Sequence, residues 1–169
     1  MRALPGLLLA WMVAGPLPST GQSLDVPLGP EPGPTARAGA WVSYAAEPQV
    51  ILAGRMQQLT LRFQVAAGYH VNSHTPRSQF LIPTELRLQP ADGVKPGAAA
   101  YPAGAPYSFA SAPQEKLDVY AGRFSITLPV QASAGEHVLH GTLRYQACDR
   151  ASCYPPQQLA VQVPFQARN

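Results

Sequence analysis

Residues 58–65 read QLTLRFQV and alternate strictly between apolar and polar side chains. A period of two is typical of a β-strand that buries one face and exposes the other. The same alternation returns in RFSITLPV, LHGTLRY and LAVQVPF, at residues 123–130, 139–145 and 159–165. Four half-buried strands are therefore predicted. Pro129 and Pro164 lie inside two of them, which favours edge positions or strand ends for those residues.

Three shorter stretches extend the strand pattern: WVSY, QVILA and TELRL, at residues 41–44, 49–53 and 84–88. No segment after the N-terminal region keeps a helical period of apolar residues. Seven or so short strands within roughly 125 residues predict an all-β chain, folded as an antiparallel immunoglobulin-like β-sandwich. A small barrel is the alternative. We expect one folded domain over residues 41–166, because the chain is long enough for one domain only.

The N-terminal region has the layout of a secretory signal. Arg2 is followed by an apolar run through Leu17 and then by Ser19, Thr20 and Gly21. This order predicts a signal peptide over residues 1–21, cleaved near Gly21, although an uncleaved anchor is an alternative. Residues 22–40 are rich in Pro, Gly and Ala and predict a flexible leader. We expect the mature chain to be exported and to have no membrane span. Outside the cytoplasm disulfides can form and persist.

The charge distribution argues against a nucleic-acid partner. Charged residues make up 12% of the chain, and its formal net charge is +3. The Lys and Arg residues are scattered along the sequence, whereas nucleic-acid binding needs a clustered basic stripe.

A long connection lies between the predicted strands at 84–88 and 123–130. Residues 90–114 are rich in proline and glycine, yet they include Tyr101, Tyr107 and Phe109. Loops of this length in a compact domain are usually functional or disordered, and the aromatic residues argue against disorder. They either pack over an open end of the sandwich or form a lid over a site.

Cys148 and Cys153 are the only cysteines, and they lie in the stretch YQACDRASCYPP, residues 145–156. A zinc site would need histidines at suitable spacing. His70 and His74 lie in a strand-to-turn context and His137 and His140 on opposite strand faces, so we expect no metal. A disulfide between the cysteines closes a very short loop, which contributes only about 2 kcal/mol. Short loops also strain the bridge and make it easier to reduce.

The cysteine stretch resembles the active-site hairpin of the periplasmic N-terminal domain of the thiol:disulfide interchange protein DsbD. Two further stretches are similar to that family: GYHVNSHTPRSQFLIPTEL at 68–86 and KLDVYAGRFSITLPV at 116–130. The resemblance implies an immunoglobulin-like periplasmic domain that shuttles electrons through its cysteines, with no cofactor. Its partners would be thioredoxin-like proteins or domains, including a membrane electron-transfer protein, and oxidised exported proteins.

The resemblance also implies roles for individual residues. Cys153 would form the mixed disulfide with a partner, and Cys148 would resolve it. Tyr145 and Tyr154 would flank the pair, and Tyr107 or Phe109 would cap it. The nearest equivalents of an acidic pair often found near the cysteines in this family are Glu115 and Asp118. DsbD proper continues into a transmembrane and a thioredoxin domain, so this chain would take its electrons from another protein.

A non-catalytic function is the alternative to thiol-disulfide exchange. The chain would then be an immunoglobulin-like protein-binding domain whose disulfide merely braces a hairpin. Accessibility bears on the choice, because thiol-disulfide exchange needs one exposed sulfur and a shielded neighbour. We expect Cys148 to be covered, since it follows the strand that ends at Tyr145. Cys153 lies beyond the turn and should stand nearer the surface.

Overall fold

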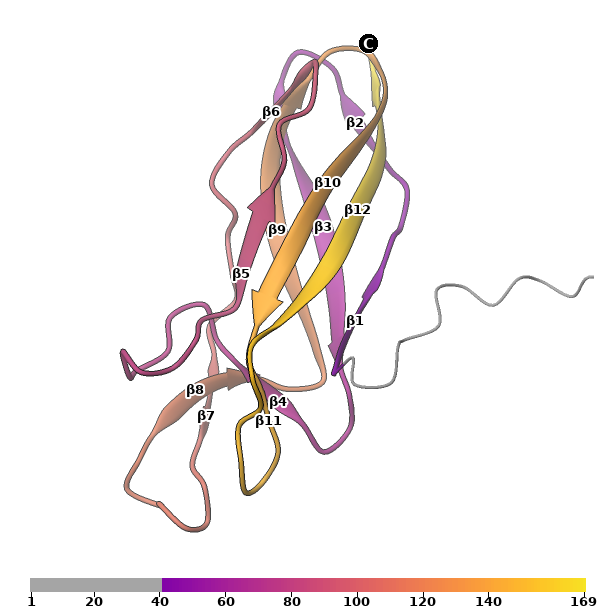
Figure 1. Cartoon of the computed structure of the whole chain (residues 1–169). Helices are drawn as coiled ribbons and strands as arrows, with labels where there is room; N and C mark the ends of the chain where they lie inside the picture. The colour runs from indigo at the N-terminus through magenta and orange to yellow at the C-terminus, as the bar shows by residue number, and fades with distance from the viewer. Residues whose placement is uncertain (1–40) are drawn as a thin grey trace, which may run out of the picture. The chain divides into compact units, whose positions relative to one another are not determined.

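The structure, a computed structural model, describes residues 41–169. The expected signal peptide (1–21) and leader (22–40) lie outside the described residues. Two four-stranded sheets face each other, and a third, smaller sheet lies at one end of them (Figure 1). This arrangement confirms the prediction of an immunoglobulin-like antiparallel β-sandwich. No helix in this part of the chain is long and apolar enough to cross a membrane.

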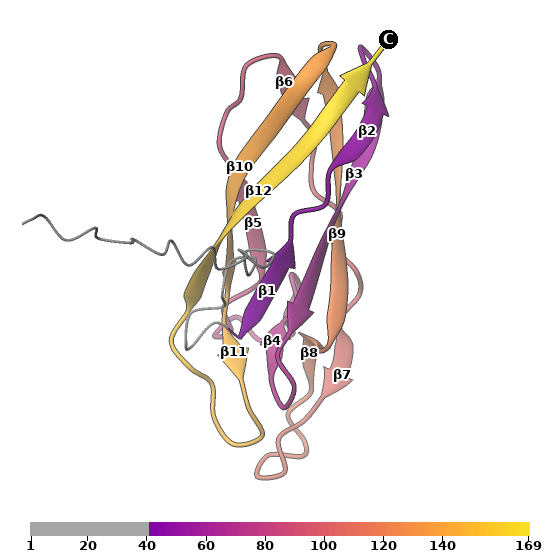
Figure 2. The ribbon, with the colours of Figure 1, turned by 90° about the vertical axis from the view of Figure 1, so that its right-hand side faces the viewer.

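The two large sheets form the body of the sandwich. The first has the strand order β1 (Val42–Ala45), β3 (Met56–Val65), β9 (Arg123–Ala132), β6 (Val94–Pro96). The second has the order β2 (Gln49–Leu52), β12 (Gln157–Arg168), β10 (Gly135–Tyr145), β5 (Glu85–Leu88). Their strands pair antiparallel except β2, which runs parallel to β12. The two sheets are seen facing each other in Figure 2.

The core lies between these sheets, where the alternating strands point their apolar side chains. Leu59, Leu61 and Phe63 of β3 are fully buried, and so are Leu143 of β10 and Val163 of β12. All five belong to one hydrophobic cluster. Each such burial contributes about 1.5–3 kcal/mol, so these side chains stabilise the sandwich strongly. The prediction of the four long strands from the period of two is confirmed.

The third sheet positions the cysteine stretch. Its strand order is β11 (Ala147–Cys148), β4 (His70–Asn72), β8 (Leu117–Tyr120), β7 (Ala105–Tyr107). β10 reaches it directly, because only Gln146 separates β10 from β11. β4 follows β3 through a turn in which Gly68 has φ 85°, a conformation that favours glycine. Both views place this small sheet at the end of the sandwich away from β6 (Figures 1 and 2).

The structure differs from the sequence prediction in its number of strands. The described residues 41–169 hold twelve strands where about seven were expected, and four of the missed ones (β4, β6, β7 and β11) have only two or three residues, too few for a visible period. The connection over 90–114 holds β6 and β7 and pairs Ala100 with Thr127 of β9. The last strand, β12, continues to Arg168.

Pro129 does not lie at a sheet edge, since β9 is flanked by β3 and β6. Its carbonyl accepts a 2.7 Å hydrogen bond from the Gly97 amide, just after β6. In an antiparallel strand the nitrogen and the carbonyl of one residue point to the same side. The proline nitrogen therefore faces this short segment, and the pairing with β3 loses no donor. Pro164 lies in β12 immediately before Phe165, where the pairing with β2 begins.

Candidate functional site

Cys148 and Cys153 form a disulfide across a tight hairpin, with their Cα atoms 3.9 Å apart. The two residues lie directly opposite each other. Backbone hydrogen bonds flank them on both sides, from the Tyr154 amide to the Ala147 carbonyl and from the Asp149 amide to the Ser152 carbonyl. The cysteines thus occupy a non-hydrogen-bonded pair, the position at which facing side chains come closest in an antiparallel ladder. The backbone itself holds both sulfurs within reach of each other.

The two sulfur-bearing residues differ sharply in exposure. Cys148 is 0% exposed, whereas Cys153 and the two prolines that follow Tyr154 are exposed. The predicted order of exposure is therefore confirmed. A partner approaching this end of the molecule meets Cys153 first, because Cys148 is buried.

Asp149 organises the turn between the cysteines. Its Oδ1 accepts hydrogen bonds from the amides of Ala151 (2.7 Å) and Ser152 (2.8 Å), as in an Asx turn. Its Oδ2 accepts a 2.7 Å hydrogen bond from the Tyr154 hydroxyl. The bonds from Ala151, Tyr154 and Ser152 lower the pKa of Asp149. The bond to Asp149 raises the pKa of Tyr154 to about 12.

The two predicted flanking tyrosines take different positions. Tyr154 stacks on Trp41, with ring centroids 4.6 Å apart, and also lies against Tyr69 at 6.1 Å. Tyr145 is almost fully buried in the sandwich core at the base of the hairpin. Burial raises the pKa of Tyr145, and the backbone of Val42 opposes that effect. Tyr154 therefore packs beside the exposed sulfur, whereas Tyr145 anchors the strand that carries the buried one.

Gln146 ties the hairpin to its surroundings. Its Oε1 accepts hydrogen bonds from Asn72 Nδ2 (3.1 Å) and from the Ile82 amide (3.3 Å), and its Nε2 donates to the Tyr154 carbonyl (3.2 Å). Asn72 Nδ2 also donates to the Ile82 carbonyl. Sequence reasoning assigned no role to Gln146 or Asn72. The signal was present, because both stand in the Tyr-Gln-x-Cys and His-x-Asn-Ser stretches that carried the family resemblance.

His70 lies beside the buried cysteine. It pairs with Cys148 across β4 and β11, and residues opposite each other in a ladder project from the same face of the sheet. The side chain is 5% exposed, and its Nε2 has no hydrogen-bond partner among the described protein atoms. Burial lowers the pKa of His70, and the nearby Asp149 charge opposes that shift. Sequence reasoning weighed this histidine only as a metal ligand.

Unpartnered buried side-chain atoms are confined to the same short stretch. Within residues 41–169 they are His70 Nε2, Asn72 Oδ1 and Ser73 Oγ. Buried polar atoms are normally paired, and exceptions need an explanation such as a catalytic role. All three atoms lie within residues 70–73, next to Cys148, so this stretch differs chemically from the rest of the described fold.

The two residues predicted as a cap lie over His70. The Tyr107 ring is 4.0 Å from the imidazole and the Phe109 ring is 5.9 Å from it. The two aromatic rings meet edge to face at 5.5 Å. β7 and the two residues that follow it thus place both rings on the face of the small sheet that carries Cys148. Tyr101 is not part of this group, because it stacks on His74 at 3.7 Å.

The two acidic residues suggested from the sequence have different surroundings. Asp118 accepts a 2.8 Å hydrogen bond from Arg77 Nε, and Glu115 is exposed. Asp149 is the acidic residue directly next to Cys148 in the chain, and its charge acts on His70.

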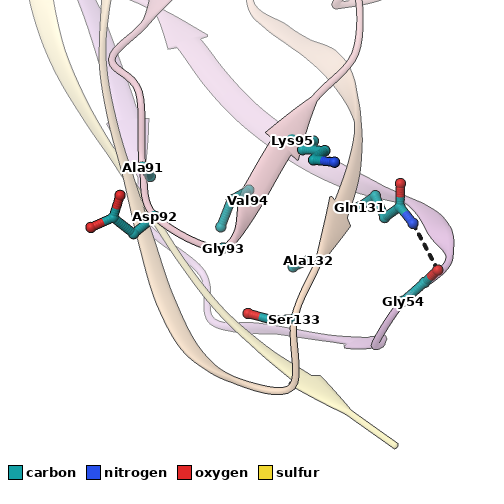
Figure 3. A pocket seen from close by; sticks show the side chains of 9 residues that line it. All are labelled: Gly54, Ala91, Asp92, Gly93, Val94, Lys95, Gln131, Ala132 and Ser133. Carbon is teal, nitrogen blue, oxygen red and sulfur yellow. Dashed lines mark hydrogen bonds between the residues drawn. The ribbon is translucent and has the colours of Figure 1, made fainter.

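The far end of the sandwich carries a hollow of about 480 Å³ near Gly54, Asp92 and Lys95. Figure 3 shows Gln131 hydrogen-bonded to the Gly54 carbonyl, with the Asp92 carboxylate directed elsewhere. No cysteine or histidine lines it. Within the described part of the chain, no cluster of three or more His, Cys, Asp or Glu residues is suited to a metal. The reactive groups are therefore concentrated at the cysteine hairpin.

Comparison with known proteins identifies the family of the chain. The family model for the N-terminal domain of the thiol:disulfide interchange protein DsbD matches residues 42–164. Among solved structures, the periplasmic N-terminal domain of ScsB from Proteus mirabilis is similar in fold, with a TM-score of 0.50 and 12% identity. That match covers 72% of this chain and 44% of the ScsB chain. No curated protein matches the chain significantly.

Two structures from Neisseria meningitidis are also similar. The reduced DsbD N-terminal domain has 20% identity and a TM-score of 0.44, over 69% of this chain and 87% of that one. The complex between the DsbD and PilB N-terminal domains has 19% identity and a TM-score of 0.45, over 75% and 84%.

Proposed function

Because this chain belongs to the family of DsbD N-terminal domains, we propose that it is a periplasmic thiol-disulfide exchange module acting through Cys148 and Cys153. The observation that carries the proposal is the asymmetry of the pair, since one cysteine is exposed and its bonded neighbour is fully buried. Exchange needs an accessible sulfur and a resolving sulfur within reach. The domain has both.

In the proposed reaction the oxidised domain first receives two electrons. A thiolate of a thioredoxin-like donor attacks Cys153 Sγ, the Cys148–Cys153 bond breaks, and Cys148 leaves as a thiolate that takes up a proton. The second donor thiol then attacks the donor sulfur of this mixed disulfide, which releases reduced Cys153 and oxidised donor. Each step transfers one sulfur–sulfur bond and needs no cofactor.

The reduced domain then passes the electrons on. Cys153 attacks the disulfide of an oxidised exported protein, and Cys148 attacks Cys153 to release the reduced product. The donor would be a thioredoxin-like protein or domain, including one carried by a membrane electron-transfer protein. Tyr107 and Phe109 would act as the cap, because they cover His70 next to the buried sulfur.

This function requires export, which residues 1–21 would direct as a signal peptide, leaving 22–40 as a leader before the folded domain. The intact mass of protein recovered from the periplasm tests that step, and a retained Met1 would contradict it.

The reduction potential tests the exchange function itself. Equilibration against glutathione and thioredoxin couples should give a value above about −300 mV, the region below which structural disulfides lie. A bridge that neither couple reduces would favour the non-catalytic binding domain.

A further inference from the structure

We propose that His70 accepts the proton of the Cys148 thiol when that buried residue becomes the resolving nucleophile. The inference rests on the proposed exchange function and adds a residue to it. Cys148 has no access to solvent. A thiol is a poor nucleophile and must lose its proton before it attacks, so a buried thiol needs a nearby base. His70 lies directly opposite it in the ladder.

The surroundings of His70 suit this role. The titratable groups that face it are Cys148 on β11, Asp149 directly after β11, and Tyr107 on β7. Burial keeps the imidazole neutral near pH 7, and its buried Nε2 is bonded to no other described group. Tyr107 and Phe109 pack against the ring, which shields it from water. A proton on the imidazole would be stabilised by the carboxylate of Asp149.

In the resolving step, Cys148 Sγ gives its proton to His70 Nε2 and its electron pair to a new bond with Cys153 Sγ. The bond between Cys153 and the partner sulfur breaks, and the partner leaves as a thiolate with that electron pair. The imidazolium then returns its proton to this thiolate or to solvent. His70 therefore acts on resolution and not on the first attack by Cys153.

A chromogenic disulfide separates the two steps. The reduced protein is mixed with one equivalent of 5,5′-dithiobis(2-nitrobenzoate). Cys153 releases the first thionitrobenzoate, and Cys148 releases the second when it resolves the mixed disulfide. His70→Gln should slow the second release by about a hundredfold at pH 7, the lower end of the range for general-base catalysis, and leave the first unchanged. The difference in the rate of the second release between wild type and His70→Gln should narrow above about pH 8.5, where a cysteine thiol ionises unaided.

The matched control is His140→Gln, which changes an exposed histidine on β10 and should leave both phases unchanged. An unchanged second phase in His70→Gln would overturn the role of His70 while the exchange function stands. Absence of any thionitrobenzoate release from reduced wild-type protein would instead overturn the exchange function.

The wild-type protein provides a second test that needs no variant to fold. With His70 as the base, the second phase should stay nearly constant from about pH 8 down to about pH 6.5 and fall only below that. A rate that rises about tenfold per pH unit across this range would show that the thiol ionises without help, and would refute the proposal.

Discussion

The hydroxyl of Tyr154 donates a 2.7 Å hydrogen bond to Asp149 Oδ2 across the turn that separates the two cysteines. The same carboxylate accepts two backbone amides of the turn through Oδ1. These bonds do not involve sulfur, so we expect them to remain when the disulfide is reduced. The hairpin is thus held in shape by a carboxylate as well as by its covalent bridge.

Replacing Asp149 with Asn should make the hairpin less stable in a pH-dependent manner. The hydrogen bonds lower the pKa of Asp149 in the folded state, so its stabilising contribution is complete above the unfolded value of about 3.9 and is lost as pH falls further. The urea midpoints of wild type and Asp149→Asn should therefore differ at pH 7 and converge below about pH 4. Asp92→Asn, at the far end of the sandwich, is the control. A difference between the two urea midpoints that stays constant with pH would contradict this prediction.

The reduced protein should remain folded. In the chain-entropy model a loop of this size contributes only about 2 kcal/mol, and the flanking backbone bonds at Ala147 and Asp149 do not involve sulfur. Far-ultraviolet circular dichroism should be unchanged after reduction, and the free energy of unfolding should fall by about 2 kcal/mol. Cooperative unfolding on reduction would identify the bridge as a structural brace.

Gln146→Ala should destabilise the domain by about 1–3 kcal/mol, because it leaves the Ile82 amide and the Tyr154 carbonyl without their side-chain partners. Denaturant unfolding measures this loss. Gln158→Ala is the matched control, since Gln158 is exposed on β12 and should change stability by less than about 0.5 kcal/mol. Equal effects of the two variants would show that the Gln146 bonds contribute little.

The long strands were predictable from the sequence because their two faces meet different surroundings. Leu59 and Leu61 enter the core while Thr60 and Arg62 do not, and that contrast repeats every second residue. β4 and β11 could not be found in this way. Every residue of these short strands is buried, so no alternation is visible.

The site was predictable in part for a related reason. The exposure of Cys153 follows from its place beyond a turn, and the resemblance identified the cysteines and the aromatic pair. The position of His70 depends on the pairing of β4 with β11, which joins residues 70 and 148. A contact between such distant positions depends on register, and nothing in the local sequence reports it. The same holds for the hydrogen bond between Asn72 and Gln146.

Truncating the cap should make the buried sulfur easier to reach. Tyr107 and Phe109 cover His70, which lies beside Cys148. In the reduced Tyr107→Ala/Phe109→Ala protein, iodoacetamide should alkylate Cys148 faster than in wild type, because attack depends on access. Peptide mass spectrometry reads the modification of each cysteine separately. Alkylation of Cys153, already exposed, is the internal control. An unchanged rate at Cys148 would show that the aromatic pair is not its cover.

The roles of the two sulfurs are tested by trapping. Cys148→Ser keeps the exposed Cys153 and removes the resolving residue, so a mixed disulfide with a thioredoxin-like partner should accumulate. Cys153→Ser leaves only Cys148, which is fully buried, and should trap little. Both variants are expressed with the natural export signal, thiols are blocked with acid and alkylating agent, and periplasmic extracts are compared on non-reducing gels. The trapped species should disappear on reduction, and mass spectrometry should identify its second chain. Equal trapping by the two variants would refute the assigned roles, because the exposure difference would then not control attack. Trapping by neither would favour a binding domain whose disulfide is structural.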